Sequence, residues 1–93
     1  MALIGSTIRL RAEFKTFDGN FVDPSSIILK IYDSKKKQIG SDIPIGLEYR
    51  ISTGIYEYDY VVPDGIGDLY YEFSGMVYDF PIVGRGMITR SWM

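Results

Sequence analysis

The chain has 93 residues and a mass of 10.6 kDa, enough for one small hydrophobic core and too little for two. It contains no Cys and no His, which excludes disulfide frameworks, Cys-based zinc sites, thiol nucleophiles and His-dependent triads. Ten basic against 12 acidic side chains give a net charge of −2, which disfavours nucleic acid and anionic membranes as partners. We therefore expect residues 1–93 to form a single compact domain.

The N-terminal third alternates apolar and charged residues with a period of two. Residues 7–15 follow this alternation throughout, which is typical of a strand with one core face and one solvent face. A turn is predicted at residues 17–21, because its Asp, Gly and Asn tolerate tight backbone conformations. The Asp-Pro pair at residues 23–24 ends this stretch, and residues 27–32 form the second predicted strand.

The middle of the chain has weaker signals. The lysine run at residues 35–37 is interpreted as a hairpin tip that its charges keep soluble and unpaired. Residues 38–45 predict a strand at a sheet edge, since Pro44 cannot donate a ladder hydrogen bond. Residues 47–51 alternate apolar and charged side chains and predict another short strand before a turn at residues 52–54.

Residues 55–62 form the clearest predicted strand, in which Tyr56, Tyr58 and Tyr60 alternate with carboxylates. Because unpaired carboxylates are rarely buried, the tyrosines are expected to face the core. The Pro-, Gly- and Asp-rich residues 63–68 are expected to link two sheets. Residues 69–74 predict a strand, 75–79 a connection and 80–92 one or two final strands, with a bulge at Gly84 and Gly86. About seven short strands without a helical segment indicate an all-β antiparallel β-sandwich.

Two groups of polar residues could carry chemistry. Glu57 and Asp59 share one face of a strand, but that face is expected to meet solvent, so paired-carboxylate catalysis is not predicted. Asp18, Asn20 and Asp23 could attract calcium, but they lack the spacing of a calcium loop and match an ordinary turn. We therefore predict no catalytic residues, no metal site and no cofactor.

Several apolar side chains fall in predicted turns or at the C-terminus, where they have no evident core to fill. Exposed aromatic residues and Met are enriched in protein–protein interfaces. The predicted interface residues are Phe17, Phe21, Met76, Tyr78, Trp92 and Met93. The C-terminal residues 90–93 could dock on the sandwich itself or on a neighbouring molecule, and both alternatives stay open. The loop aromatics could also form a platform for a glycan.

The order of motifs along the chain is strand, Asp-Gly turn, Asp-Pro, strand, Gly-x-Tyr-x-Tyr strand and a closing Gly-Arg-Gly strand. The segments that carry this order are residues 8–14, 17–24, 28–33, 53–63, 67–75 and 84–92. The order resembles small immunoglobulin-like β-sandwich structural proteins of tailed bacteriophages and prophages, over nearly the whole chain.

The resemblance implies an immunoglobulin-like sandwich that is made in the host cytoplasm and built into the virion. Its place would be a head decoration or head fibre, or a head–tail or tail connector subunit. Expected partners are other virion proteins or further copies of this chain, and neither nucleic acid nor membrane. No catalytic residues come with the resemblance, and we expect no enzymatic activity. The alternative function is a carbohydrate- or cell-surface-binding β-sandwich module.

Overall fold

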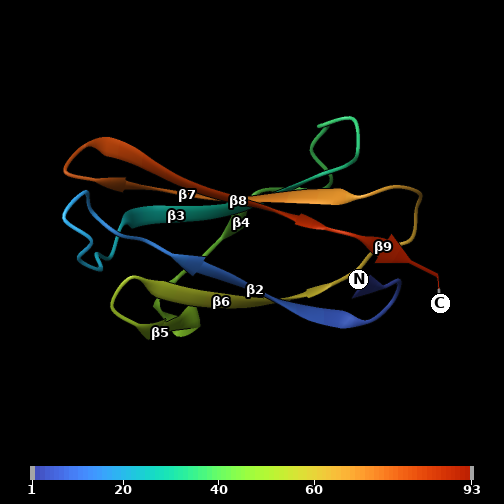
Figure 1. The fold of residues 1–93 in the computed structure, drawn as a ribbon, viewed down its shortest axis with the longest axis horizontal. Coiled ribbons are helices and arrows are strands. Elements are labelled where there is room, and N and C mark those ends of the chain that lie inside the picture. Colours follow the sequence, from blue (N-terminus) through green and yellow to red (C-terminus); the bar gives the residue numbers. More distant parts are fainter. Residues whose placement is uncertain (1, 93) are drawn as a thin grey trace.

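The computed structural model describes residues 2–92 and shows an all-β architecture of packed sheets (Figure 1). The expected fold class, an antiparallel β-sandwich, is confirmed. Residues 2–92 contain nine strands where about seven were expected, because three two-residue segments count as strands. In chain order they are β1 (Ala2–Leu3), β2 (Thr7–Glu13), β3 (Ser25–Tyr32), β4 (Ile43–Pro44), β5 (Arg50–Ser52), β6 (Ile55–Val61), β7 (Leu69–Val77), β8 (Phe80–Ile88) and β9 (Arg90–Ser91).

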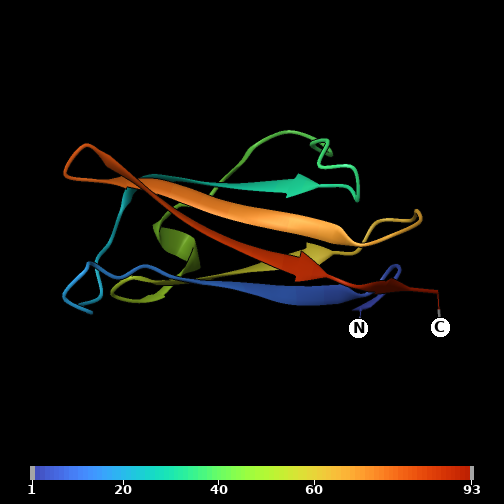
Figure 2. The ribbon, with the colours of Figure 1, turned by 45° about the horizontal axis from the view of Figure 1, so that its top comes forward.

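The strands form two main sheets with antiparallel pairing. One sheet has the order β2-β6-β5 and the other the order β4-β3-β7-β8. The loop of residues 63–68 carries the chain from β6 to β7 and so from one sheet to the other, as the sequence predicts. β1 and β9 form a separate parallel pair at the end of the sandwich where the chain begins and ends (Figures 1 and 2).

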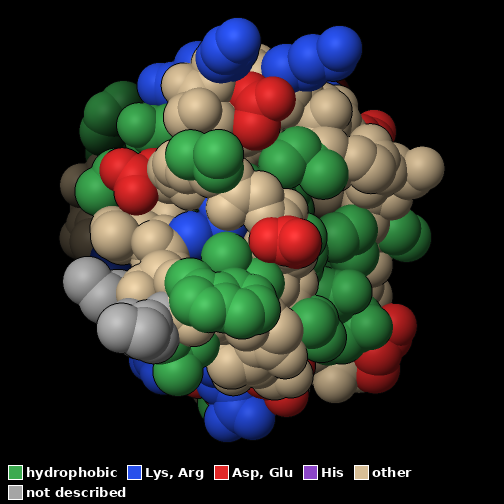
Figure 3. Space-filling view, turned by 90° about the vertical axis from the view of Figure 1, so that its right-hand side faces the viewer, with side chains coloured by type: hydrophobic (Ala, Val, Ile, Leu, Met, Phe, Trp, Pro, Cys, Tyr) green, Lys and Arg blue, Asp and Glu red, His purple; other side chains and the backbone are tan. Residues whose placement is uncertain are grey.

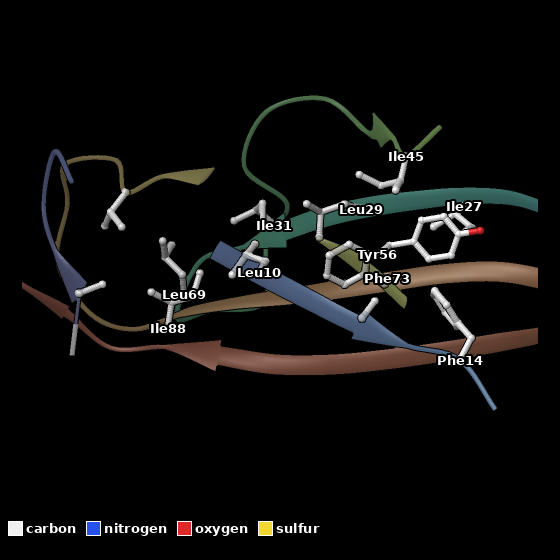
Figure 4. Close-up of a cluster of buried hydrophobic side chains, with 13 residues drawn as sticks. Leu10, Phe14, Ile27, Leu29, Ile31, Ile45, Tyr56, Leu69, Phe73 and Ile88 are labelled. Carbon is white, nitrogen blue, oxygen red and sulfur yellow. The ribbon is translucent and has the colours of Figure 1, made fainter. Parts of the chain in front are cut away.

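The core lies between the two sheets, and each strand turns its apolar alternate residues toward it. On β2 the side chains of Leu10 and Ala12 are buried while the charged neighbours are exposed. Figure 4 shows side chains of β2 and β6 meeting those of β3 and β7. The buried cluster consists of Ala2, Leu10, Ala12, Phe14, Ile27, Leu29, Ile31, Ile45, Tyr56, Val62, Leu69, Phe73 and Ile88.

The expected inward orientation of the β6 tyrosines is confirmed. Tyr56 is buried at 2% exposure and packs edge-on against Phe14, with ring centroids 6.0 Å apart. Tyr58 and Tyr60 are partly buried against the same core. Tyr58 also packs edge-on against Tyr49, with ring centroids 5.2 Å apart. The tyrosines of β6 therefore fill the core and do not form an exposed platform.

Residues 47–51 do not form the single strand that their alternation predicts. Leu47–Tyr49 form one turn of 3-10 helix, and β5 begins only at Arg50. The turn closes when the Tyr49 amide donates to the Gly46 carbonyl at 3.1 Å, which brings the Tyr49 ring onto Tyr58. Alternation over so few residues cannot distinguish a strand from such a turn.

Two expectations about β7 and β8 are wrong. β7 continues to Val77, so residues 75–77 belong to the strand, and only Tyr78 and Asp79 connect it to β8. The two strands pair without a register shift from Leu69 opposite Ile88 to Val77 opposite Phe80, so no bulge exists at the glycines. A side chain at Gly86 would instead collide with the hydroxyl and ring of Tyr71 on the neighbouring strand. This glycine leaves room for a core aromatic ring.

A carboxylate holds the loop after β2 onto the β5–β6 turn. Asp23 Oδ1 accepts hydrogen bonds from the Gly54 amide at 2.7 Å, the Tyr56 hydroxyl at 3.2 Å and Arg50 Nε at 3.2 Å. The second oxygen lies 3.1 Å from Arg50 Nη2. These interactions, with the Gly54 amide first, lower the pKa of Asp23 below its ordinary value of 3.8. Burial, reinforced by the adjacent carboxylate, raises the pKa of Tyr56, which keeps its hydroxyl protonated as a donor.

This arrangement predicts a loss of stability in acid. Because the pKa of Asp23 is lower in the folded protein, the unfolded chain takes up a proton first as pH falls below about 3.8. The free energy of unfolding should then decrease until pH reaches the folded-state pKa, and should be independent of this group above about pH 5. Asp23→Asn should be less stable at neutral pH and should show a shallower acid dependence than the native chain. Urea unfolding between pH 2 and 7 measures both, and equal slopes for the two chains would contradict the prediction.

Candidate functional site

Exposed aromatic side chains come together at the end of the sandwich away from the chain termini. The loop after β2 and the β7–β8 hairpin lie at this end in both ribbon views (Figures 1 and 2). Between them is an open groove of about 560 Å³. We call this the hairpin groove; its lining residues are Lys15, Thr16, Phe17, Asp18, Val22, Val77, Tyr78, Phe80, Pro81 and Ile82.

One wall of the hairpin groove is a tight loop that exposes Phe17. The Thr16 amide donates to the Asn20 carbonyl at 2.9 Å, and the Gly19 amide donates to the Thr16 carbonyl at 3.0 Å. Gly19 has a φ of +82°, a conformation that glycine adopts without steric cost. Phe17 therefore sits at the tip of a short closed turn and is fully exposed, at 112% of its reference area.

The other wall is a two-residue hairpin turn with an unusual sequence. Tyr78 and Asp79 both have positive φ angles, +49° and +66°, as a type I′ turn requires. Asn and Gly are the residues that usually take these positions, and a tyrosine with positive φ is strained. The turn leaves Tyr78 at 86% exposure and Phe80, the first residue of β8, at 74%.

The base of the groove is apolar, and its polar groups lie on one wall. Val22, Val77 and Ile82 are partly buried and form the apolar base. Apart from the Tyr78 hydroxyl, the polar side chains among the lining residues are those of Lys15, Thr16 and Asp18, all from the loop after β2. Chemically the groove can bury apolar or aromatic groups of a ligand and offer it one cation and one anion at the edge.

In the structure the predicted interface residues lie in three places: at each of the two ends of the sandwich and on the outer face of one sheet. Phe17 and Tyr78 line the hairpin groove. Phe21 lies nearby, opposite Lys15 in a single β-bridge, and the Lys15 ammonium covers its ring at 4.8 Å. Met76 is on the outer face of β7 at 38% exposure, and Met93 lies outside the described residues. Trp92 is at the opposite end and 77% exposed.

The end that carries Trp92 is a second apolar surface. Leu3 and Ile66 are also exposed, at 48% and 95%, and Figure 3 shows apolar side chains spread over this end of the molecule. The guanidinium of Arg90 holds the 63–68 loop by donating to four of its backbone carbonyls at 2.8–3.3 Å. Arg90 and Ser91 are therefore docked on the chain's own sandwich, whereas the Trp92 side chain is exposed and both alternatives stay open for it.

Sequence reasoning missed Phe80 and Ile66 as exposed apolar residues. Phe80 belongs to a predicted strand, and its exposure depends on the turn that precedes it. A signal was available in the sequence, because the alternation of β7 continues past Ser74 to Val77. Following it would have placed the turn at Tyr78. Ile66 stands alone between two glycines in a breaker cluster, which is itself a sign of exposure.

The carboxylates weighed for catalysis form a cross-strand ion-pair network on the outer face of the three-stranded sheet. Arg9 Nε donates to Asp59 at 2.9 Å, and Arg11 Nη1 lies 3.4 Å from Glu57. The bond from Arg9 is the main cause of a lowered pKa of Asp59. Among residues 2–92, no three acidic side chains gather in a way that could hold a metal ion.

The lysine run forms a closed loop after β3. Asp33 Oδ1 accepts hydrogen bonds from the backbone amides of Lys35 at 2.9 Å and Lys37 at 3.0 Å, and these bonds lower the pKa of Asp33. The Lys36 ammonium lies 4.0 Å from the centre of the Tyr70 ring on β7. The loop therefore contacts the four-stranded sheet at Tyr70.

Comparison of the chain with protein-family models, curated proteins and solved structures gives no match. Within residues 2–92 there is no helix long and apolar enough to span a lipid bilayer.

Proposed function

We propose that this chain is a non-enzymatic structural protein of a tailed-phage virion, an immunoglobulin-like sandwich that docks on neighbouring capsid, connector or tail subunits. The observation that carries the docking role is the hairpin groove, where Phe17, Tyr78 and Phe80 are exposed around an apolar base. The virion assignment is supported by the order of sequence motifs. Together they suggest a rigid sandwich that presents an adhesive end to another subunit.

Two physical properties of the groove support docking. Burying an exposed aromatic or aliphatic side chain contributes about 1.5–3 kcal/mol, so the three aromatics supply a substantial part of a protein–protein contact. The strained backbone at Tyr78 also costs folding free energy of order 1 kcal/mol, which a turn of Asn and Gly would avoid. A large exposed aromatic ring kept at a strained position is understandable if the ring serves binding.

The test replaces the turn while preserving the fold. The double variant Tyr78→Asn with Asp79→Gly should raise the free energy of unfolding by about 1 kcal/mol, because it relieves two strained positions. The same variant should be depleted at least about tenfold from purified particles of the phage that encodes it, because the contact loses an aromatic anchor. Urea unfolding and quantitative mass spectrometry of the particles measure these effects. Unchanged incorporation of the stabilised variant would remove the groove from the proposal.

A substitution at the end that carries Trp92 tests whether that apolar surface also contributes to docking. Trp92→Ala should leave the sandwich folded, since this side chain is 77% exposed. If Trp92 contributes a second contact, the variant should also be depleted from particles while the groove remains intact. Normal incorporation of Trp92→Ala would assign docking to the hairpin groove alone.

A carbohydrate- or cell-surface-binding module is the second candidate, and one observation favours it. Aromatic rings and the polar side chains of Lys15, Thr16 and Asp18 line the same groove, a combination that suits a sugar ring with its hydroxyls. Binding would then shift tyrosine fluorescence on addition of a glycan, and Tyr78→Ala would abolish the shift. A glycan array without hits would count against this function and leave protein docking as the explanation of the groove.

A further inference from the structure

β8 is a long sheet edge that none of residues 2–92 covers along most of its length. It is the last strand in the order β4-β3-β7-β8 and pairs with β7 over all nine of its residues. The chain covers this edge only beyond Ile88, where the Ala2 amide donates to the Thr89 carbonyl at 2.7 Å and the Ile4 amide to the Ser91 carbonyl at 2.9 Å. Residues 81–87 remain open among the residues that the structure describes.

The register shows which backbone groups face the open side. Val77 and Phe80 flank a two-residue turn and so exchange both ladder bonds, and every second pair after them does the same. The backbone amides and carbonyls of the even-numbered residues of β8 therefore bond to β7, and those of the odd-numbered residues point away from β7. The bonds from Ala2 to Thr89 and from Ile4 to Ser91 agree with this alternation. The free edge consists of Val83, Arg85 and Met87, with the carbonyl of Pro81.

The side chains along this edge are suited to pairing. Val83 and Met87 are apolar and exposed at 45% and 57%. Arg85 carries the one charge, and Glu72 on β7 pairs with it at 2.8 Å. The edge strand β2 differs, because its exposed face carries the arginines and glutamate of an ion-pair network. β4 and β5, the remaining edges of the two main sheets, have only two and three residues. Charged or short edges resist pairing, whereas β8 is nine residues long and carries a single charge and a single proline.

We propose that β8 pairs antiparallel with β8 of a second copy, about a twofold axis at Gly84, to form one continuous eight-stranded sheet. This register places Val83 opposite Arg85 of the other copy and Pro81 opposite Met87. Each Val83–Arg85 pair exchanges two bonds and each Met87 amide donates to a Pro81 carbonyl, about six bonds in all. Every free amide of the edge then finds an acceptor, although proline supplies no donor.

The self-complementarity of this register is the reason to choose a second copy as the occupant. An axis at Arg85 would place two guanidinium groups directly opposite, which is destabilising. An axis at Val83 would place Asp79 of the hairpin turn opposite an edge residue. An axis at Gly86 would do the same with Thr89, whose carbonyl is already bonded to Ala2. Both registers therefore form fewer hydrogen bonds.

The proposal is independent of the virion role, and its surface overlaps the hairpin groove only at Pro81 and Ile82. Light scattering of the purified chain should give twice the 10.6 kDa protomer mass at micromolar concentration. Val83→Lys should raise the dissociation constant at least about tenfold relative to Val83→Glu, because each variant side chain lies opposite Arg85 of the other copy. The Tyr78→Asn, Asp79→Gly variant should remain dimeric. A register that pairs Val83 with itself would weaken both charged variants equally.

Amide hydrogen exchange provides a second readout that does not depend on the variants. In the native chain the amides of Val83, Arg85 and Met87 should be protected, as are those of Gly84 and Gly86. In Val83→Lys at low concentration, the amides of Arg85 and Met87 should lose protection while the glycines keep theirs. A monomeric mass at all concentrations up to about 1 mM, equal dimerisation of the lysine and glutamate variants, or unprotected odd-numbered amides in a dimer would each overturn the proposal.

Discussion

Phe73→Ala should lower the free energy of unfolding by about 3–5 kcal/mol, because this ring is one of the two largest fully buried side chains. Phe73 lies on β7 at 1% exposure, between Leu29 of β3 and Gly84 of β8, and its ring packs edge-on against Tyr71 at 6.0 Å. Truncation would leave a cavity in the middle of the core, because the surrounding side chains come from both sheets (Figure 4).

The same substitution at an exposed phenylalanine is the matched control. Phe80→Ala is expected to cost less than about 0.5 kcal/mol, since that ring is 74% exposed. Domains of this size have a total stability of about 5–15 kcal/mol, so Phe73→Ala should lower the melting temperature by about 15 °C or more. Urea and thermal unfolding followed by circular dichroism measure both variants. A cost below about 1 kcal/mol for Phe73→Ala would contradict the central position of this ring.

The strands with strong alternation could be predicted from the sequence, because burial of one face imposes a period of two on the residues themselves. The strands β2, β3 and β6 start and end within two residues of their expected bounds. The structure differs where a residue's role depends on a neighbouring strand. Gly84 and Gly86 were interpreted as a bulge, but Gly86 is needed because Tyr71 of β7 occupies the space of its side chain. No local pattern carries that information.

The hairpin groove could be predicted only in part, for a related reason. Phe17 follows from its own turn, whose Asp, Gly and Asn are recognisable in the sequence. Phe80 and the position of Tyr78 depend on a turn that lacks the usual Asn and Gly, so sequence preferences placed the end of β7 too early. The open edge of β8 was equally hidden, since strand order is set by pairing between distant segments.

Gly54→Ala should destabilise the chain by about 2–4 kcal/mol, because the turn between β5 and β6 has no room for a side chain. Gly54 has a φ of +74°, and a methyl group there would lie 2.7 Å from the Phe14 carbonyl and 3.0 Å from backbone atoms of Val22. These are main-chain atoms held by their own bonds, since the Phe14 amide donates to the Gly54 carbonyl at 2.8 Å. Relief would require the strand ends to separate, and that would also break the bond from the Gly54 amide to Asp23.

Gly19→Ala separates the collision from the backbone strain. Gly19 has a similar φ of +82°, but nothing lies within 4 Å of the position of its added methyl group. It should therefore cost only about 1 kcal/mol, the ordinary penalty for alanine in a left-handed conformation. The difference between the two variants in urea unfolding measures the close approach of the two loops, and equal costs would contradict it. Because the loop around Gly19 forms one wall of the hairpin groove, Gly54→Ala should also reduce docking, through displacement of that wall, at temperatures where the variant is still folded.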